Sequence, residues 1–75
     1  MGRVILLSDI SGSIWKINCK VGDAVESGQD VIVIESMKME IPVVSTVTGT
    51  VVSIFIVEGE MVDEDQKLIE LNTED

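Results

Sequence analysis

A lysine between two methionines is the feature of this sequence that could carry chemistry. Lys38 stands in the run Glu-Ser-Met-Lys-Met-Glu, residues 35–40, and apolar, β-branched residues flank that run on both sides. We interpret the run as a turn, yet it contains no Gly, Asn, Asp or Pro, the residues that favour tight turns. A conflict between local preference and global pattern is typical of a functional site.

The plain interpretation of Lys38 is a solvated surface lysine. We interpret three other lysines in that way: Lys16, Lys20 and Lys67. The neighbours Met37 and Met39 favour a different role for Lys38, because soft, unbranched side chains suit a surface that several partners must grip. The alternative is that both methionines pack against the edge of the folded domain.

The chain offers no catalytic set of its own. It has no histidine and one cysteine, which excludes a Ser-His-Asp or Cys-His arrangement, a zinc site and an internal disulfide. It also has no glycine-rich phosphate loop before a Lys-Ser or Lys-Thr pair. The acidic residues of 58–65 lack the twelve-residue spacing of a calcium loop, so we interpret them as a solvated turn and expect no metal.

Charge and hydropathy restrict the partners. The 75 residues include 5 Lys and Arg against 14 Asp and Glu, a formal charge of −9. This balance argues against nucleic acids and against anionic membranes as partners. No apolar run approaches the roughly 20 residues of a membrane span, and Ser8 and Asp9 cut the N-terminal apolar run short of a signal peptide. We expect a cytoplasmic domain, where a free cysteine is typical.

An internal repeat divides the sequence into two halves. A shift of 37 residues lays residues 8–35 on residues 45–72 and pairs glycine with glycine at Gly12 and Gly49 and at Gly22 and Gly59. The repeat predicts two similar halves related by a pseudo-two-fold axis. The run 35–40 has no internal copy, so we expect it at one end of the molecule, opposite both termini.

Each half has the pattern of about four short strands. Val, Ile and Leu dominate the apolar residues and favour strands. After a turn near 11–12 or 48–49, we expect a second strand over 13–21 or 50–57, a short strand near residue 25 or 62, and a closing strand over 31–35 or 68–71. Ile32 and Ile34 should point inward and Val33 outward. Such spacing predicts an all-β sandwich or flattened barrel.

We expect Cys19 to be a strand residue without chemistry. We expect Trp15 to pack on the sandwich with its indole N–H near the surface.

The run 35–40 resembles the biotin attachment motif of biotinyl domains, the carrier modules of biotin-dependent carboxylases, whose usual form is Glu-Ala-Met-Lys-Met. Ser36 stands where alanine is commonest, and both residues are small. Further matches lie along nearly the whole chain: Gly12–Ile17, Val21–Asp23, Val25, Gly28–Gln29, Gly49–Val51 and Glu58–Glu60. The chain lacks room for the extra thumb loop of some bacterial acyl-CoA carboxylase carriers.

The resemblance implies a single biotinyl domain over residues 1–75, a flattened barrel of two four-stranded sheets with the modified lysine at its tip. It implies biotin in amide linkage on Lys38, with recognition by the residues around it: Glu35, Ser36, Met37, Met39 and Glu40. The implied partners are a biotin protein ligase, a biotin carboxylase and a carboxyltransferase, between which the carrier shuttles a carboxyl group.

Two alternatives to a biotinyl domain fit the same residues. Lipoyl domains share the implied fold and the lysine hairpin, but carry an Asp-Lys-Ala type of tip; Met37 and Met39 favour biotin over lipoate, and some short members of the family accept either group. The other alternative is an unmodified interaction domain with the same barrel-sandwich fold.

Overall fold

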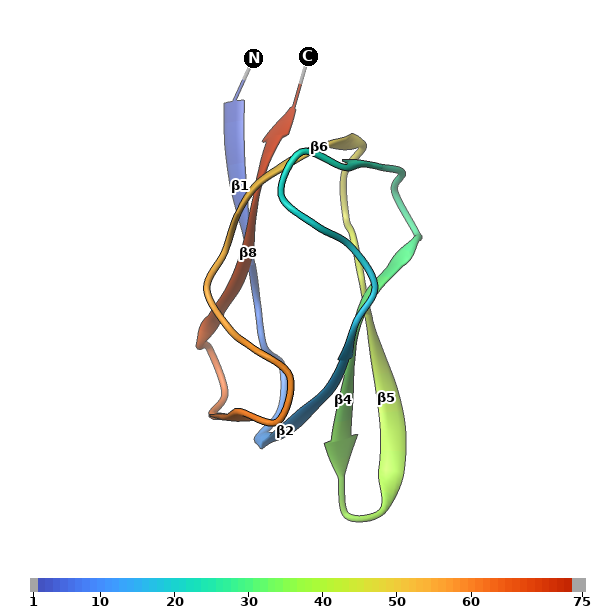
Figure 1. Ribbon diagram of the computed structural model, residues 1–75, viewed down its shortest axis with the longest axis vertical. Helices are drawn as coiled ribbons and strands as arrows, with labels where there is room; N and C mark the ends of the chain where they lie inside the picture. Colours follow the sequence, from blue (N-terminus) through green and yellow to red (C-terminus); the bar gives the residue numbers. More distant parts are fainter. Residues whose placement is uncertain (1, 74–75) are drawn as a thin grey trace.

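The computed structural model describes residues 2–73, which form eight β-strands and no helix (Figure 1). The strands are β1 (Gly2–Leu7), β2 (Gly12–Ile17), β3 (Ala24–Val25), β4 (Asp30–Ser36), β5 (Met39–Val44), β6 (Gly49–Ile54), β7 (Met61–Val62) and β8 (Lys67–Thr73). They form two four-stranded antiparallel sheets, in the orders β1-β8-β6-β3 and β5-β4-β2-β7. The all-β sandwich predicted from the sequence is confirmed.

The two halves repeat strand by strand. A shift of 37 residues carries β1 onto β5, β2 onto β6, β3 onto β7 and β4 onto β8 with the same bounds, and it exchanges the two sheets. Polar contacts repeat as well. Ser8 and Ser45 are both buried, and their hydroxyls donate hydrogen bonds to the carbonyls of Ile10 and Val47, at 2.6 and 2.5 Å. The pseudo-two-fold relation therefore holds for the backbone and for buried hydrogen bonds.

Apolar side chains from both sheets, and from the loops that follow β2 and β6, fill the space between the sheets. The core contains Leu6, Ile14, Cys19, Val25, Val31, Ile32, Ile34, Val51, Ile56, Val62, Leu68, Ile69 and Leu71. Ile32 and Ile34 are fully buried and Val33 is half-buried, as the sequence predicted for β4. Burial of each such aliphatic side chain contributes about 1.5–3 kcal/mol, which makes this core the main stabilising element of a chain without a disulfide.

Two glycines allow strands to approach closely below the two ends of the molecule. A Cβ at Gly12 would collide with the carbonyl oxygen of Glu35 in β4, and a Cβ at Gly49 would collide with that of Asn72 in β8. The two contacts are related by the internal repeat. Glycine is needed at both positions because any side chain would push these strands apart.

The second strand of each half is shorter than predicted. β2 ends at Ile17 and β6 at Ile54, rather than at residues 21 and 57. Beyond these points, backbone amides donate hydrogen bonds to side chains. The amide of Lys20 donates to Asp23, and the amide of Val57 donates to Glu60. Such local bonds offer the backbone an alternative to the sheet ladder.

Cys19 lies in the first of these loops, so its placement in a strand was wrong. The thiol is buried, and its Sγ lies 3.9 Å from the carbonyl oxygen of Val31. Burial raises the pKa of the Cys19 thiol, and the negative charge of Asp23 raises it further. Trp15 is nearly half exposed, and its ring centroid lies 5.4 Å from the Nζ of Lys16.

The molecule is elongated, with extents of 37 × 18 × 17 Å. The hairpin of β4 and β5 forms one end, and β1 begins and β8 finishes at the other (Figure 1). Within the described residues, this confirms that residues 35–40 lie at the end opposite the first residue of β1 and the last residue of β8. No helix able to cross a membrane occurs in residues 2–73.

Candidate functional site

The turn at the tip of the β4–β5 hairpin contains two residues. Ser36 pairs with Met39, which leaves Met37 and Lys38 as the loop. Both loop residues have positive φ, 51° for Met37 and 65° for Lys38. Positive φ at both central residues defines the type I′ turn, whose twist matches that of the flanking strands. The turn is therefore shorter than the six residues expected, because residues 35–36 and 39–40 belong to the strands.

This turn is strained by its side chains. Neither Met nor Lys favours the left-handed region, where an L-residue loses roughly 1–2 kcal/mol. The ladder below the turn holds it in place, through the pairs Ser36 with Met39, Glu35 with Glu40 and Ile34 with Ile41. Since Ile34 is fully buried, the hairpin cannot slip without exposing it. The backbone of Lys38 is consequently held in one orientation.

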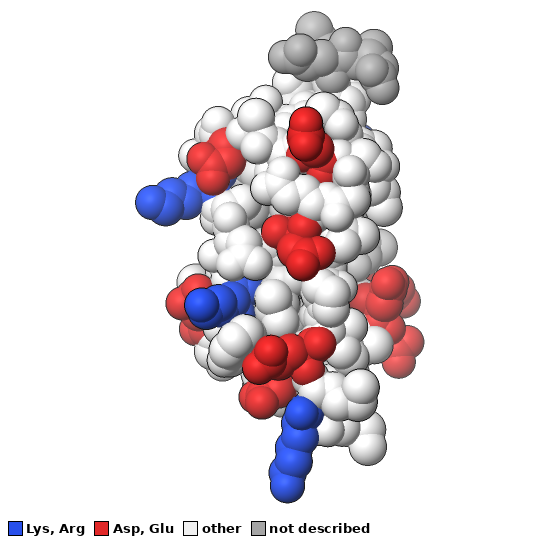
Figure 2. Space-filling view, turned by 90° about the vertical axis from the view of Figure 1, so that its right-hand side faces the viewer, with Lys and Arg blue, Asp and Glu red and all other residues white. Residues whose placement is uncertain are grey.

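Lys38 and both methionines project into solvent. Met37 is 93% exposed and Met39 is 63% exposed, so the alternative that they pack on the sandwich edge is wrong. Lys38 is exposed as well, and the ion pair found among residues 2–73 joins Arg3 and Glu70 instead. Figure 2 shows a single basic side chain extending from the hairpin end of the molecule. A partner enzyme can reach the amine from all outward directions.

Two carboxylates lie opposite each other just below the turn. Glu35 and Glu40 are both exposed and are directly paired across the two strands. Side chains of such a pair stand about 5 Å apart, and like charges there are destabilising. Acidic side chains gather above the projecting lysine in Figure 2. The tip thus carries the cation of Lys38 above two carboxylates. The carboxylates complement a basic surface on a partner.

The site offers the chemistry of one exposed primary amine, that of Lys38. No group of three or more His, Cys, Asp or Glu side chains in the described part of the chain is placed to hold a metal ion. Ser36 is half-buried beside the turn and is small enough to leave the lysine accessible. The amine can be acylated by an enzyme that supplies an activated carboxyl group and a base.

Sequence reasoning singled out these residues but missed two geometric features, the two-residue turn and the opposed carboxylates. The signal for both was present. Glu35 and Glu40, and beyond them Ile34 and Ile41, stand at equal distances from the pair Met37 and Lys38. Matching residues at equal distances from a central pair indicate a two-residue hairpin, and they place Glu35 opposite Glu40.

Comparison with known proteins agrees with this geometry. A family model of biotin/lipoyl domains, described as "Biotin-requiring enzyme", matches residues 6–71. The biotin/lipoyl attachment protein of Bacillus subtilis is 44% identical over 63 residues, which are 84% of this chain and 86% of that protein. The human mitochondrial propionyl-CoA carboxylase alpha chain is 40% identical over 67 residues, which are 89% of this chain but 9% of that protein.

A solved structure has the same fold. The crystal structure of the Kluyveromyces lactis urea carboxylase matches with a TM-score of 0.89 and 36% sequence identity, over 96% of this chain and 6% of that one. The chain therefore spans most of the bacterial attachment protein and a small part of the two carboxylases. On the family model and these relatives, the chain belongs to the biotin/lipoyl attachment domain family.

Proposed function

We propose that residues 1–75 form one biotin carboxyl carrier domain and that biotin is attached in amide linkage to Lys38. The observation that carries the proposal is the Met-Lys-Met sequence in an exposed type I′ turn at the tip of a stiff hairpin. The carboxylases among the relatives support biotin as the group and carboxyl transfer as its use. The bound biotin would supply the carboxyl-carrying chemistry, while the chain supplies attachment and position.

Attachment requires Lys38 to act as a nucleophile. An ammonium group has no lone pair with which to attack, so the reaction needs the free amine, and a biotin protein ligase must supply the base. The Nζ atom then attacks the carbonyl carbon of an activated biotinyl adenylate, the N–C bond forms, and the nucleotide leaves as its monophosphate. The fixed turn supports this step, because the amine is presented with little ordering cost on binding.

The residues around Lys38 have recognition roles in this proposal. Met37 and Met39 offer apolar, adaptable contacts to the ligase and the carboxylase. Glu35 and Glu40 offer charges to basic partner surfaces, and Ser36 keeps the approach to the lysine open. The strain of the turn and the opposed carboxylates both reduce stability, which supports a role for these residues in binding.

The same carrier would serve two partner sites in turn, a biotin carboxylase and a carboxyltransferase. Repeated visits require weak docking, and a net charge of −9 favours fast encounter with basic surfaces. In this proposal the domain has no catalytic residue of its own and binds no metal, nucleic acid or membrane. We place it in the cytoplasm, where the free thiol of Cys19 would stay reduced.

The test is the intact mass of the protein after co-expression with a biotin ligase or, separately, a lipoate ligase. We expect one biotinyl group, mapped to Lys38 by peptide analysis and absent from Lys38→Arg. The matched control is Lys20→Arg, another exposed lysine, which should be modified like the unaltered protein. Biotin on another lysine, or no adduct on a folded protein, would refute the assignment; the second result would favour an unmodified interaction domain.

Lipoate is the second candidate for the attached group. The observation that favours it is the 44% identity to a protein named for both biotin and lipoyl attachment, at nearly its full length. A lipoyl adduct without a biotinyl adduct would support this function in place of carboxyl transfer.

A further inference from the structure

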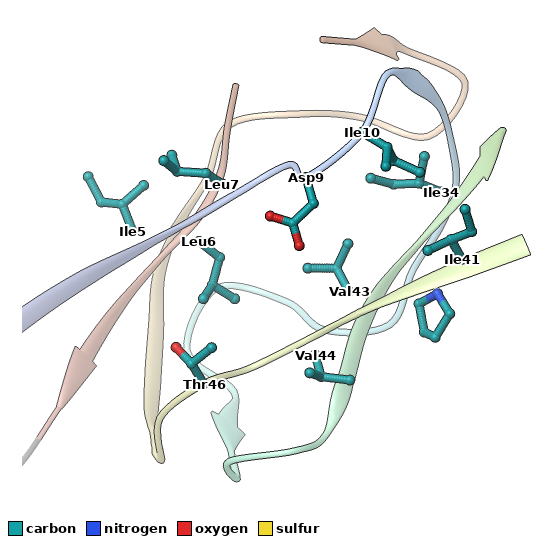
Figure 3. Close-up of a pocket in the computed structure, with 11 residues that line it drawn as sticks. Ile5, Leu6, Leu7, Asp9, Ile10, Ile34, Ile41, Val43, Val44 and Thr46 are labelled. Atoms are coloured by element: carbon teal, nitrogen blue, oxygen red, sulfur yellow. The ribbon is translucent and has the colours of Figure 1, made fainter. Parts of the chain in front are cut away.

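A groove runs between the free edges of the two sheets. β1 is the outer strand of one sheet and β5 the outer strand of the other. Between them lies a groove of about 350 Å³, lined by apolar side chains of both strands with the buried Ile34 among them (Figure 3). Asp9 and Thr46, which correspond in the internal repeat, both line it, so the groove straddles the pseudo-two-fold axis.

One carboxylate points into this apolar surface. Asp9 is the one charged residue among those that line the groove, and its side chain is directed inward, toward Val43 (Figure 3). The ion pair among residues 2–73 lies elsewhere, between Arg3 and Glu70, so Asp9 faces no cation of its own chain. An apolar groove with one anionic acceptor suits a ligand that is apolar except for one or two N–H donors.

The groove begins next to the lysine turn. Ile34 and Ile41 form its near end, and they are paired two residues below the pair of Ser36 and Met39 that closes the turn. At about 3.4 Å per residue, Ile41 lies roughly 7 Å and Val43 roughly 14 Å along β5 from Met39. A biotinyl-lysine arm has about ten single bonds of ~1.5 Å between Cα and the ring system, so its ring can fold back to this stretch.

We infer that this groove is a resting site for the prosthetic group on Lys38 of the same molecule. This inference rests on the proposed attachment of biotin to Lys38. The thioether ring and the carbon chain lie along Ile41 and Val43, above the buried Ile34, and a urea N–H donates a hydrogen bond to the carboxylate of Asp9. No covalent change is involved. Tethering makes a weak site sufficient: at an effective concentration in the millimolar range, a site of millimolar affinity is occupied about half of the time.

The first test compares backbone amide NMR spectra of the unmodified and the biotinylated protein, after intact mass and peptide mapping have established the load on Lys38. Failure of attachment would thereby be seen before the groove is tested. We expect shift differences at two places, the turn and the groove amides of Ile10, Val43 and Val44. Differences confined to residues 36–39 would overturn the inference.

The second test removes the acceptor. In biotinylated Asp9→Ala we expect the groove shifts to fall by at least half, and the association rate with avidin to rise about twofold as the resting fraction is released. Glu26→Ala is the matched control, because it removes the same charge from an exposed position that does not line the groove. Equal behaviour of the two variants would overturn the role of Asp9.

Lipoate provides a control that leaves the protein unchanged. A lipoyl group has the same amide linkage to lysine and a similar chain, but its dithiolane ring has no N–H donor. If the lipoyl form is prepared, its groove shifts should be weaker and indifferent to Asp9→Ala. A lipoyl form that depends on Asp9 as strongly as the biotinyl form would contradict the proposed hydrogen bond.

Discussion

The two ends of this molecule are built on one backbone plan and differ in their side chains. At the lysine end, β4 pairs with β5 through Ser36 and Met39; at the terminal end, β8 pairs with β1 through Thr73 and Gly2, which are the corresponding positions of the repeat. One step inward, Glu35 faces Glu40 at the lysine end. At the terminal end Asn72 faces Arg3.

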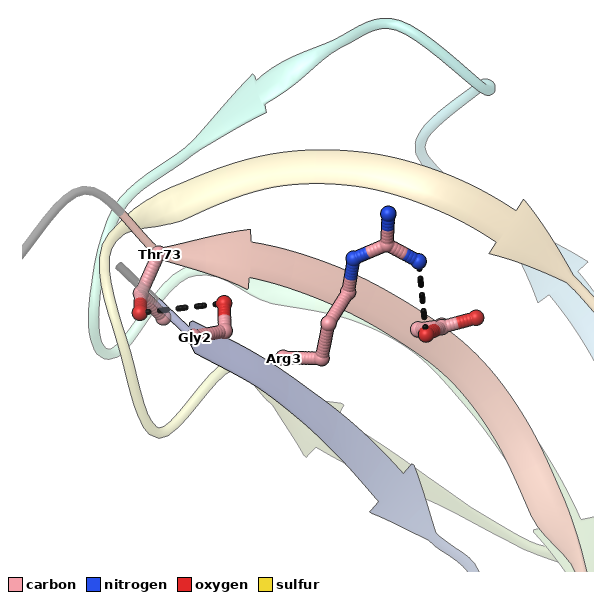
Figure 4. Close-up of polar contacts among 4 residues, drawn as sticks. Gly2, Arg3 and Thr73 are labelled. Atoms are coloured by element: carbon pink, nitrogen blue, oxygen red, sulfur yellow. Dashed lines mark hydrogen bonds and ion pairs between the residues drawn. The ribbon is translucent and has the colours of Figure 1, made fainter.

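The terminal end is joined by attractive polar contacts. The Thr73 hydroxyl donates a hydrogen bond to the carbonyl of Gly2 at 3.2 Å, and Arg3 forms an ion pair with Glu70 at 3.0 Å (Figure 4). The lysine end has a like-charge pair, a strained turn and two exposed methionines in the corresponding places. The strand pairing is shared, so at the paired positions the difference lies in the side chains, and only the lysine end adds the strained turn. Both differences lower the stability of the lysine end while they leave Lys38 exposed to a partner.

The largest expected effect concerns the position of the lysine within the turn. In the double variant Met37→Lys with Lys38→Met, the charge and composition are conserved but the amine leaves the second turn position. We expect the rate of biotinylation by the ligase to fall more than 100-fold, because a shift by one residue redirects the side chain. Intact mass against time measures this rate, and circular dichroism checks the fold. Modification of the lysine at position 37 at the original rate would contradict this expectation. It would show that the ligase needs an exposed lysine at this end of the molecule but not at the second position of the turn.

The next largest effect tests whether the same kind of close strand contact, at Gly12 and at Gly49, stabilises both ends of the molecule. Gly12→Ala and Gly49→Ala each place a Cβ against a carbonyl oxygen, that of Glu35 or Asn72, and overpacking of this kind costs about 3 kcal/mol. We expect similar losses in the free energy of unfolding, measured by urea titration, and a slower biotinylation only in Gly12→Ala, which displaces the strand of the turn.

Gly2→Ala is the control for these two variants. Its Cβ would lie 3.6 Å from the Thr73 Oγ1, an ordinary contact, so the stability should hardly change. A large difference between Gly12→Ala and Gly49→Ala would mean that the two halves are less equivalent than their hydrogen bonds indicate.

The sequence predicted the symmetry and the position of the lysine, because both depend on strong periodic signals. The repeat of glycines and aliphatic residues defines the sheets, and the residue run without a copy must join the halves. It did not predict where β2 and β6 end, since Asp23 and Glu60 end them through bonds between a side chain and the backbone that no hydropathy pattern records. The groove beside Asp9 was also missed, because its walls come from two strands that pair in different sheets.

A smaller effect should follow from relief of strain at the lysine end. Asn tolerates positive φ better than Met, so Met37→Asn is expected to raise the free energy of unfolding by about 1 kcal/mol. Met61→Asn is the control, because Met61 is a comparably exposed methionine in β7 whose backbone is a strand; there we expect no gain. Urea titration of both variants gives the comparison, and an unchanged or lower stability of Met37→Asn would show that the turn carries no strain.

The smallest effect tests the like-charge pair itself. Glu40→Arg gives the lysine end the residue that Arg3 provides at the terminal end, and it turns a repulsive cross-strand pair into an attractive one. Such a pair is worth about 0.5 kcal/mol, so the free energy of unfolding should rise by that amount at low ionic strength. The gain should shrink in about 1 M salt, where screening acts within roughly 3 Å. Biotinylation should become slower in the same variant, because a partner with a basic surface now meets a cation. A variant that is more stable and equally well modified would separate the two properties, and it would mean that Glu40 reduces stability without serving recognition.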